Sequence, residues 1–462
     1  MQLLSLSDSV DCAKCKSRRI PCDRTLPKCR KCFSRSFECP GYGIILRWNE
    51  GVTSKGRVTE RRSPKRPQES VSPLISEISH SLSTPSLQLL RHFDQNIATK
   101  LAWVDGPENP WRHIILPLSH ASPIVLYSVL AMSSEDLAHK YAADHPSFQK
   151  FQAESLRHRD RVLSLLPQHL GLLLNTPSST ECVNQGRFAL ASVLLLYNLE
   201  LLTAEATQWR LHIQGARAII QWKLQAIHRY RPPDIADIFL LYEYYFTAVF
   251  IGLTTFDTVD DIVSDIPANG SITIFTDFFR IIQTITRAER LRYTSANTAT
   301  IWIEDIAREL EAARGLTLQT KEVMQFQYRE AREDFVHLTH MYYYASLIYA
   351  HRVLSEYVHS EDLIRNSREA MFDHLSHLMK RTYFAHDLVW PLFIAGTECR
   401  QFPDKQCIIE EAFLGVIRVS GSLDRRRVLS FLKMYWTMDV NSDTSWVHVA
   451  RTRPGDCSFM II

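Results

Sequence analysis

The chain has 462 residues, of which 45% are hydrophobic, so it can bury a sizeable core beside a smaller module. Its formal net charge of +3 conceals an asymmetry, because residues 1–67 hold 16 Lys and Arg against 6 Asp and Glu, whereas the remainder holds 37 basic and 44 acidic residues. One end is therefore suited to a polyanion. The first ten residues lack a secretory pattern, and no stretch reaches the roughly 18–20 uninterrupted apolar residues of a membrane helix. We expect a soluble, intracellular protein without a membrane partner.

The basic end contains six cysteines in two identical halves, each spaced C-x2-C-x6-C: Cys12, Cys15, Cys22, Cys29, Cys32 and Cys39. In an intracellular protein, clustered cysteines are more often metal ligands than disulfides. Zinc takes four tetrahedral ligands, and six thiolates satisfy two zinc ions when two sulfurs bridge the metals. The repeat makes Cys12 and Cys29 the natural bridging pair. Cys15 and Cys22 would then complete one site, and Cys32 and Cys39 the other.

Two alternatives to the binuclear arrangement were weighed. A single zinc held by the two C-x2-C pairs would leave Cys22 and Cys39 without a role, although they occupy equivalent positions in the two halves. A disulfide framework is disfavoured by the absence of a signal peptide. Two zinc ions per chain are therefore the prediction.

Basic residues interleave with these cysteines and outweigh the charge of −2 that six thiolates and two zinc ions would carry: Lys14, Lys16, Arg18, Arg19, Lys28, Arg30 and Lys31. The surplus positive charge is available for phosphates. These seven side chains are therefore the predicted contacts to a nucleic acid.

Residues 12–39 closely resemble the DNA-binding domain of the fungal binuclear zinc cluster transcription factors. All six cysteine positions match, as do the basic run before the third cysteine and Pro27 before the fourth. The resemblance implies that each C-x2-C opens a short helix and that the first helix enters the major groove, typically at a CGG triplet. Arg18 and Arg19 match the family's base-reading pair, and arginine can bind guanine bidentately. Phosphate contact alone is the alternative. Pro21 replaces the usual Lys or Arg.

Residues 42–86 are rich in Pro and Ser and poor in bulky apolar residues, which predicts a flexible linker. The basic run at 61–66 is either a nuclear localisation signal or a solvated part of this linker. Prolines at 73 and 85 confine the one apolar helical seam to eleven residues, too few for a coiled coil. A homodimer would therefore have to form through the large domain.

From Leu87 onward, apolar residues recur at helical spacing, and Thr84-Pro85 is a helix start signal. Alternating strand patterns are scarce, so the fold class is predicted to be all-α: a zinc cluster module at 11–41, the linker at 42–86 and a helical regulatory domain at 87–440. The expected helices span residues 124–139, 188–202, 209–227, 238–253, 275–293, 333–357, 368–388 and 408–434.

Segments 103–139, 209–220 and 390–400 resemble the fungal-specific transcription factor domain of the second type. This resemblance covers roughly 87–440 and implies a regulatory domain without shared catalytic residues. The common nucleophile, zinc-protease, phosphate-loop and dinucleotide motifs are absent from the sequence, so we expect no enzyme.

Histidine pairs at 337/340 and 374/377 each share a helix face, but we expect them to lie on a helix surface or in the core rather than bind metal. The aromatic runs at 242–246 and 342–344 are explained most simply as core packing, with an effector pocket between helices as the alternative.

Together these features predict a nuclear, sequence-specific, zinc-dependent transcriptional regulator that binds double-stranded DNA. A homodimer and a small-molecule effector or co-regulator are the further partners considered. A role in controlling a biosynthetic or metabolic gene set is an expectation from the family resemblance.

Overall fold

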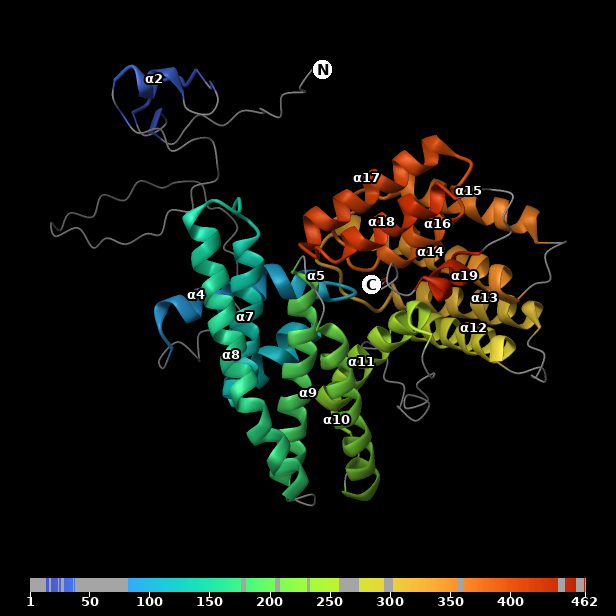
Figure 1. Ribbon diagram of the computed structural model, residues 1–462, viewed down its shortest axis with the longest axis horizontal. Helices are drawn as coiled ribbons and strands as arrows, with labels where there is room; N and C mark the ends of the chain where they lie inside the picture. The colour runs from blue at the N-terminus through green and yellow to red at the C-terminus, as the bar shows by residue number, and fades with distance from the viewer. Residues whose placement is uncertain are drawn as a thin grey trace. The chain divides into compact units, whose positions relative to one another are not determined.

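The computed structural model describes residues 14–15, 18–23, 25, 29–35, 37, 82–175, 180–203, 208–230, 233–256, 274–294, 302–354, 360–438, 445–453 and 461. The chain divides into two units, 1–69 and 70–462, and each is described by itself. Every regular element within the described residues is a helix (Figure 1). The predicted all-α fold class is therefore confirmed.

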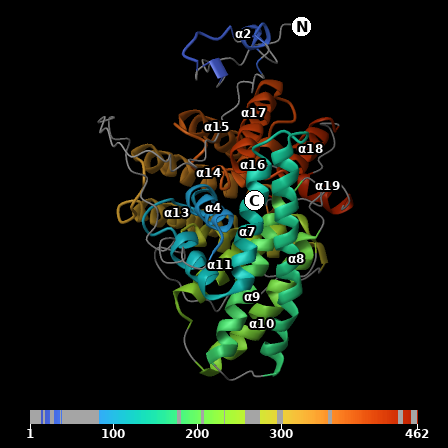
Figure 2. The same ribbon diagram turned by 90° about the vertical axis from the view of Figure 1, so that its left-hand side faces the viewer.

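The first half of the large unit surrounds one apolar core. Its elements are α4 (Thr84–His92), η1 (Phe93–Ile97), α5 (Ala98–Leu101), η2 (Trp111–Ile115), α6 (Leu116–Ala121), α7 (Pro123–Ala138), α8 (Pro146–Asn175), α9 (Thr180–Leu201) and α10 (Trp209–Tyr230). Ser83 caps α4 with its side chain and Pro85 occupies the first turn, as the start signal predicts. Helices α7 to α10 lie side by side as long rods (Figure 2).

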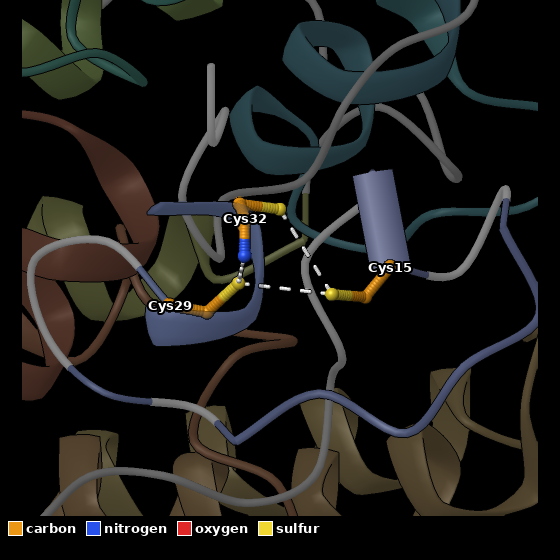
Figure 3. A group of neighbouring side chains, drawn as sticks. All are labelled: Cys15, Cys29 and Cys32. Carbon is orange, nitrogen blue, oxygen red and sulfur yellow. Dashed lines mark hydrogen bonds between the residues drawn. The ribbon is translucent and has the colours of Figure 1, made fainter. Parts of the chain in front are cut away.

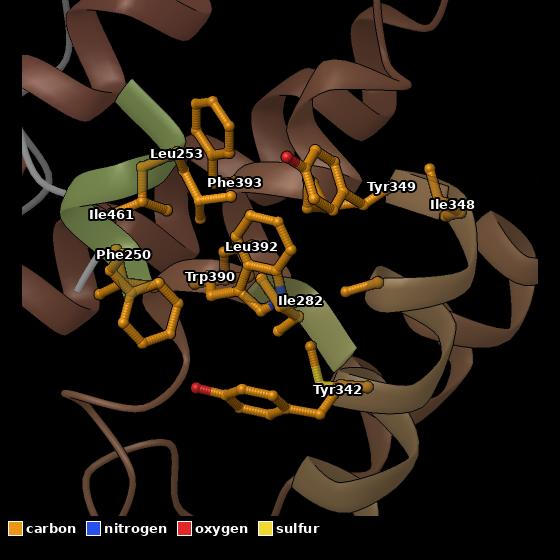
Figure 4. Close-up of a cluster of buried hydrophobic side chains, with 14 of the residues drawn as sticks. Phe250, Leu253, Ile282, Tyr342, Ile348, Tyr349, Trp390, Leu392, Phe393 and Ile461 are labelled. Carbon is orange, nitrogen blue, oxygen red and sulfur yellow. The ribbon is translucent and has the colours of Figure 1, made fainter. Parts of the chain in front are cut away.

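The second half surrounds a second core. Its helices are α11 (Ile235–Thr254), α12 (Thr276–Thr294), α13 (Ile303–Thr320), α14 (Arg329–Leu354), α15 (Glu361–His377), α16 (Val389–Thr397), α17 (Pro403–Ser420), α18 (Arg425–Trp436) and α19 (Trp446–Thr452). Aromatic side chains dominate this core, and Tyr349, Trp390 and Phe393 interleave at its centre (Figure 4). The rings of Tyr349 and Trp390 meet edge to face, with centroids 5.4 Å apart, which is a favoured aromatic geometry.

Helix α11 belongs to both cores. Phe239 and Tyr244 pack in the first core, whereas Phe246 and Phe250 pack in the second. By length and composition α11 could cross a membrane, but 67% of its most apolar window is buried inside the domain. Burial on both sides explains its apolar composition, because a core helix needs no polar face.

A buried ion cluster joins two helices of the first half to α11. The Asp237 carboxylate of α11 lies 3.0 Å from Arg187 Nε of α9 and 2.7 Å from Lys223 Nζ of α10. Burial alone would raise the pKa of Asp237, but the hydrogen bond from Arg187 and the charge of Lys223 outweigh it and lower that pKa. Asp237 thus fixes the positions of α9, α10 and α11 relative to one another.

Two of the predicted helices are wrong in extent. The helix expected at 408–434 is split into α17 and α18, because Gly421 adopts a left-handed backbone conformation (φ 77°) that ends α17. The helix expected at 368–388 ends at His377, and turns follow it. Helices α8 and α13 were not expected; α8 contains Pro167, which reads as a helix breaker in sequence.

Candidate zinc and DNA-binding site

Lys14 and Cys15, at the end of the first C-x2-C motif, lie on a helical turn. The turn ends at Arg19, whose φ of 54° is left-handed, and the Ile20 amide donates to the Cys15 carbonyl over 3.2 Å. A left-handed residue followed by such a long-range amide bond is a recurrent helix C-terminus. Arg18 and Arg19 therefore lie at the C-terminal end of the first helical turn, and Ile20 separates them from Pro21.

The second C-x2-C motif opens α2 (Arg30–Phe33). Cys29 is the N-cap residue, and its sulfur accepts a hydrogen bond from the Cys32 amide over 3.3 Å. A cysteine in this position points its sulfur toward the helix N-terminus, where the exposed amides favour a thiolate. The C-x2-C spacing thus brings the sulfur of Cys29 and a second cysteine to one end of a helix.

Asp23 is a structural residue of this site that sequence reasoning missed. Its carboxylate accepts hydrogen bonds from the amides of Arg30 (3.0 Å) and Lys31 (2.9 Å), at the first turn of α2. The hydrogen bond from the Thr25 hydroxyl is the largest cause that lowers the pKa of Asp23, although some burial opposes it. The D-x-T pattern at 23–25, which suits a side-chain-capped turn, was the available signal.

Three cysteine sulfurs converge between the two motifs (Figure 3). The Cys15 sulfur lies 3.6 Å from that of Cys29 and 3.9 Å from that of Cys32, and all three residues are fully buried. With zinc–sulfur bonds of about 2.3 Å, tetrahedral coordination places two sulfurs about 3.8 Å apart. The Cys15–Cys29 separation therefore fits the zinc that the predicted arrangement has them share, whereas Cys15 and Cys32 also lie close although that arrangement assigns them to different zinc ions.

Cys29 also lies near Cys22, since their sulfurs and a carboxylate oxygen of Asp23 all fall within 4.8 Å of one another. Cys29 thus contacts sulfurs from both halves of the repeat, as a bridging ligand must. Its expected bridging partner, Cys12, and the sixth cysteine, Cys39, lie outside the described residues. Asp23 is occupied by the amides of α2, which favours a capping role over metal ligation.

The predicted DNA-contacting residues differ in exposure. Lys14, Arg19, Arg30 and Lys31 are exposed, whereas Arg18 is half-buried. Two others, Lys16 and Lys28, lie outside the described residues. The guanidinium of Arg18 lies 4.6 Å from the centre of the Phe37 ring, and Lys14 Nζ lies 5.1 Å from it. Phe37 therefore holds two cations on one side of the module.

Lys31 has a local structural contact in addition to its exposure. Its ammonium group donates to the Pro21 carbonyl over 2.9 Å, which ties α2 to the segment that follows the first helical turn. Of the predicted DNA contacts within the described residues, Arg19 and Arg30 are exposed and make no ring contact with Phe37.

Comparison with protein families identifies both units. The fungal specific transcription factor domain matches residues 88–460, and the fungal Zn(2)-Cys(6) binuclear cluster domain matches residues 10–49. Because the first match covers more than half of the chain, the protein belongs to the fungal-specific transcription factor family. Two zinc ions per chain, DNA binding and a role in transcription regulation, all predicted from the sequence, are confirmed by these matches.

Two curated relatives are similar over part of the chain. The acriflavine sensitivity control protein acr-2 of Neurospora crassa is 39% identical over 59 residues, 13% of this chain and 10% of that protein. The transcriptional activator protein UGA3 of Saccharomyces cerevisiae is 22% identical over 245 residues, 46% of this chain and 44% of that protein. This chain therefore spans less than half the length of either relative. No solved structure matches it.

Proposed function

We propose that this protein is a nuclear, sequence-specific transcriptional regulator that reads CGG-like triplets in the major groove. Residues 11–41 bind the DNA, and the helical domain at 87–440 regulates. The convergence of Cys15, Cys29 and Cys32 at zinc-sharing distances, beside exposed basic residues, is the observation that carries this proposal. The nuclear location is supported by the family and by the basic run at 61–66.

The proposed zinc ligands are all six cysteines of the repeat: Cys12, Cys15, Cys22, Cys29, Cys32 and Cys39. When bound, the two metals supply the folding free energy of a module that is too small to bury a core. The chain's own contribution is to cap α2 through Asp23 and to end the first helical turn at Arg19. Together these features hold the basic side chains on one small scaffold.

Within this proposal, Arg18 and Arg19 read base edges, while Lys14, Lys16, Lys28, Arg30 and Lys31 contact phosphates. Arg19 is exposed at the helix end, which suits a bidentate contact to guanine. Arg18 would have to leave Phe37 to reach a base. The helical domain is proposed to sense a small-molecule effector or co-regulator, and to form any homodimer. Catalysis is no part of the proposal, because the family is one of transcription factors.

Binding of the full-length chain to a CGG probe and to a probe with the triplet scrambled tests the proposal. Cys22→Ser should abolish specific binding and reduce the zinc content, because a ligand is lost. Cys407→Ser is the matched control, since Cys407 is an exposed cysteine of the helical domain, and it should bind as the wild type does. Equal binding to both probes, or full binding by Cys22→Ser, would contradict the proposal.

A further inference from the structure

The helical domain contains a cavity of about 60 Å³ between its two cores. Trp111, Tyr197 and Leu201 line it from the first core, and Phe250, Tyr342 and Trp390 line it from the second. The last three side chains lie around one space in the centre of the domain (Figure 4). Since one water molecule needs roughly 10–15 Å³ of such space, the cavity has room for about four waters or for one very small ligand.

Two carboxyl groups face this cavity without adequate partners. Within the described residues, the Glu243 side chain accepts no hydrogen bond, and the Asp387 carboxylate receives one only from its own backbone amide. Trp390, only 1% exposed, adds an indole N–H that has no acceptor. Buried polar groups are nearly always satisfied by protein, water or ligand. Trp390 Nε1 is such a group, and the half-buried carboxyl groups of Glu243 and Asp387 beside it offer partners for an occupant.

The charges around the cavity favour a cationic occupant. Arg425 is the neighbouring buried cation, and it donates to the Ala385 carbonyl (3.1 Å) and to His386 Nδ1 (2.9 Å). Burial lowers the pKa of His386, and the charge of Arg425 lowers it further, so His386 is neutral. Two ionised carboxylates against one guanidinium would leave a net charge of −1, which one ligand cation neutralises.

Burial favours the protonated form of both carboxyl groups when no cation is present. Burial raises the pKa of Glu243 to about 8, with a contribution from the nearby charge of Asp387, and burial also raises the pKa of Asp387. A bound cation would reverse this and favour both ionised forms. The aromatic walls, which include Trp103 and Phe246, suit the same ligand, because aromatic rings attract cations.

We infer that this cavity binds a small organic cation, a protonated alkylamine of about three to five non-hydrogen atoms, with its ammonium group beside Glu243 and Asp387. Its alkyl chain lies against the aromatic walls. This inference rests on the proposed regulatory role of the helical domain and names the class of its effector. Because the walls come from both cores, such a ligand stabilises their packing together, which gives the domain a means to respond to it.

Thermal unfolding of the zinc-loaded full-length chain tests the inference at constant ionic strength. Propylammonium chloride should raise the midpoint by several degrees, because it binds only the folded state. The neutral 1-propanol and the anionic propionate have similar size and should leave the midpoint unchanged. A wild-type chain that responds equally to propylammonium, propanol and sodium chloride would overturn the inference and leave a cavity filled only by water.

Variants locate the binding. Glu243→Gln and Asp387→Asn keep the shape of the side chain, and each should weaken the apparent affinity for propylammonium at least tenfold. Glu309→Gln, an exposed glutamate on α13, is the matched control and should bind as the wild type does. Unchanged affinity in both cavity variants would place the cation elsewhere and refute the assignment.

A series of alkylammonium ions of increasing length tests the inference on the wild-type protein. It therefore still applies if a substitution impairs folding. Affinity should rise from ammonium to propylammonium and fall sharply for hexylammonium, which exceeds the cavity. A steady rise with chain length would indicate non-specific hydrophobic binding and contradict the inference. These measurements contain no DNA, so a negative result would not contradict the proposed DNA binding. Likewise, a failure to bind CGG probes would not contradict the proposed cation binding.

Discussion

At the scale of single residues, Arg18 and Arg19 are neighbours with different environments. Arg19 is exposed in a left-handed conformation, whereas Arg18 is half-buried against Phe37 and its Nη1 has no hydrogen-bond partner among the described residues. A left-handed residue ends the helical turn and directs its side chain away from the helix axis. The two arginines, which are equivalent as a sequence pattern, are therefore expected to differ in their availability to DNA.

Arg19→Gly separates the role of the side chain from that of the backbone. Glycine adopts a φ of 54° without strain, so this variant should keep its zinc content and fold. It should lose about 1–3 kcal/mol of discrimination between CGG and a mismatched triplet if Arg19 reads a guanine. Competition binding with single-base substitutions measures this loss. Arg35→Ala, at another exposed arginine, is the control, and an unchanged preference in Arg19→Gly would exclude Arg19 as a base reader.

At the scale of elements, helix positions followed from apolar periodicity, but several ends did not. Helices α7, α11 and α12 have long apolar segments and were predicted within a few residues. The single helix predicted at 408–434 failed because a glycine is compatible with a helix interior as well as with a C-terminus. The packing of the chain after Ser420, which the sequence does not show, is what places Gly421 at the C-terminus of α17. Helix α8 was missed because Pro167 predicts the end of a helix, although this long helix continues through it.

Gly421 provides the test at this scale. Gly421→Ala should destabilise the domain by about 1 kcal/mol, because a left-handed backbone conformation is strained for alanine. A clash is not the cause, since an added Cβ would meet its neighbours at an ordinary 3.6 Å. Gly415→Ala lies inside α17 with open space around it, so it should instead stabilise by about 0.5–1 kcal/mol. Urea unfolding compares the two, and equal effects would contradict this account.

A second element-scale prediction concerns the contact between α14 and α15, where the sequence-predicted histidine pairs meet. The Nδ1 atoms of His337 and His374 are 3.0 Å apart, and the rings of His340 and His374 stack with centroids 4.6 Å apart. Burial, and then the charges of His340 and His337, lower the pKa of His374 to about 4. The folded state therefore binds fewer protons than the unfolded state between about pH 4 and 6.5, and stability is lost as pH falls through this window.

His374→Gln should reduce this acid sensitivity. Between pH 7 and pH 5, the variant should lose about 1–2 kcal/mol less unfolding free energy than the wild type, because one proton acceptor is removed from the unfolded chain. His448→Gln on α19, an exposed histidine, should behave like the wild type. Chemical unfolding at the two pH values provides the comparison. Identical losses in all three proteins would mean that the histidine contact does not control acid stability.

At the scale of the whole molecule, the zinc module and the helical domain differ in how much of each site could be predicted from the sequence. The cysteine spacing encodes a local metal site, so the ligand set and metal count could be written down before any coordinates. The cavity could not, because its walls come from positions as distant as Leu101 and Ile461 and only tertiary packing joins them. Asp23 was missed because the amides that its carboxylate caps lie seven and eight residues further along the chain.

The spacing of DNA half-sites is the prediction that involves the whole chain. The composition of residues 42–86 predicts a flexible tether, and about 45 residues of such a chain have a root-mean-square span of about 35–40 Å. One turn of DNA between half-sites has a similar length. The protein should therefore bind single CGG sites, or pairs at several spacings, with similar affinity. Probes with gaps from zero to a dozen base pairs provide the measurement, and a sharp optimum at one gap would reveal a rigid dimer neck.

Because α11 supplies side chains to both cores, neither half of the helical domain has a complete hydrophobic interior without it. The two halves are therefore expected to melt together, in one cooperative transition, although each has a core of its own. Fragments divided on either side of α11 would each expose a broad apolar face and aggregate. The smallest autonomous folding unit of this region is accordingly the whole helical domain.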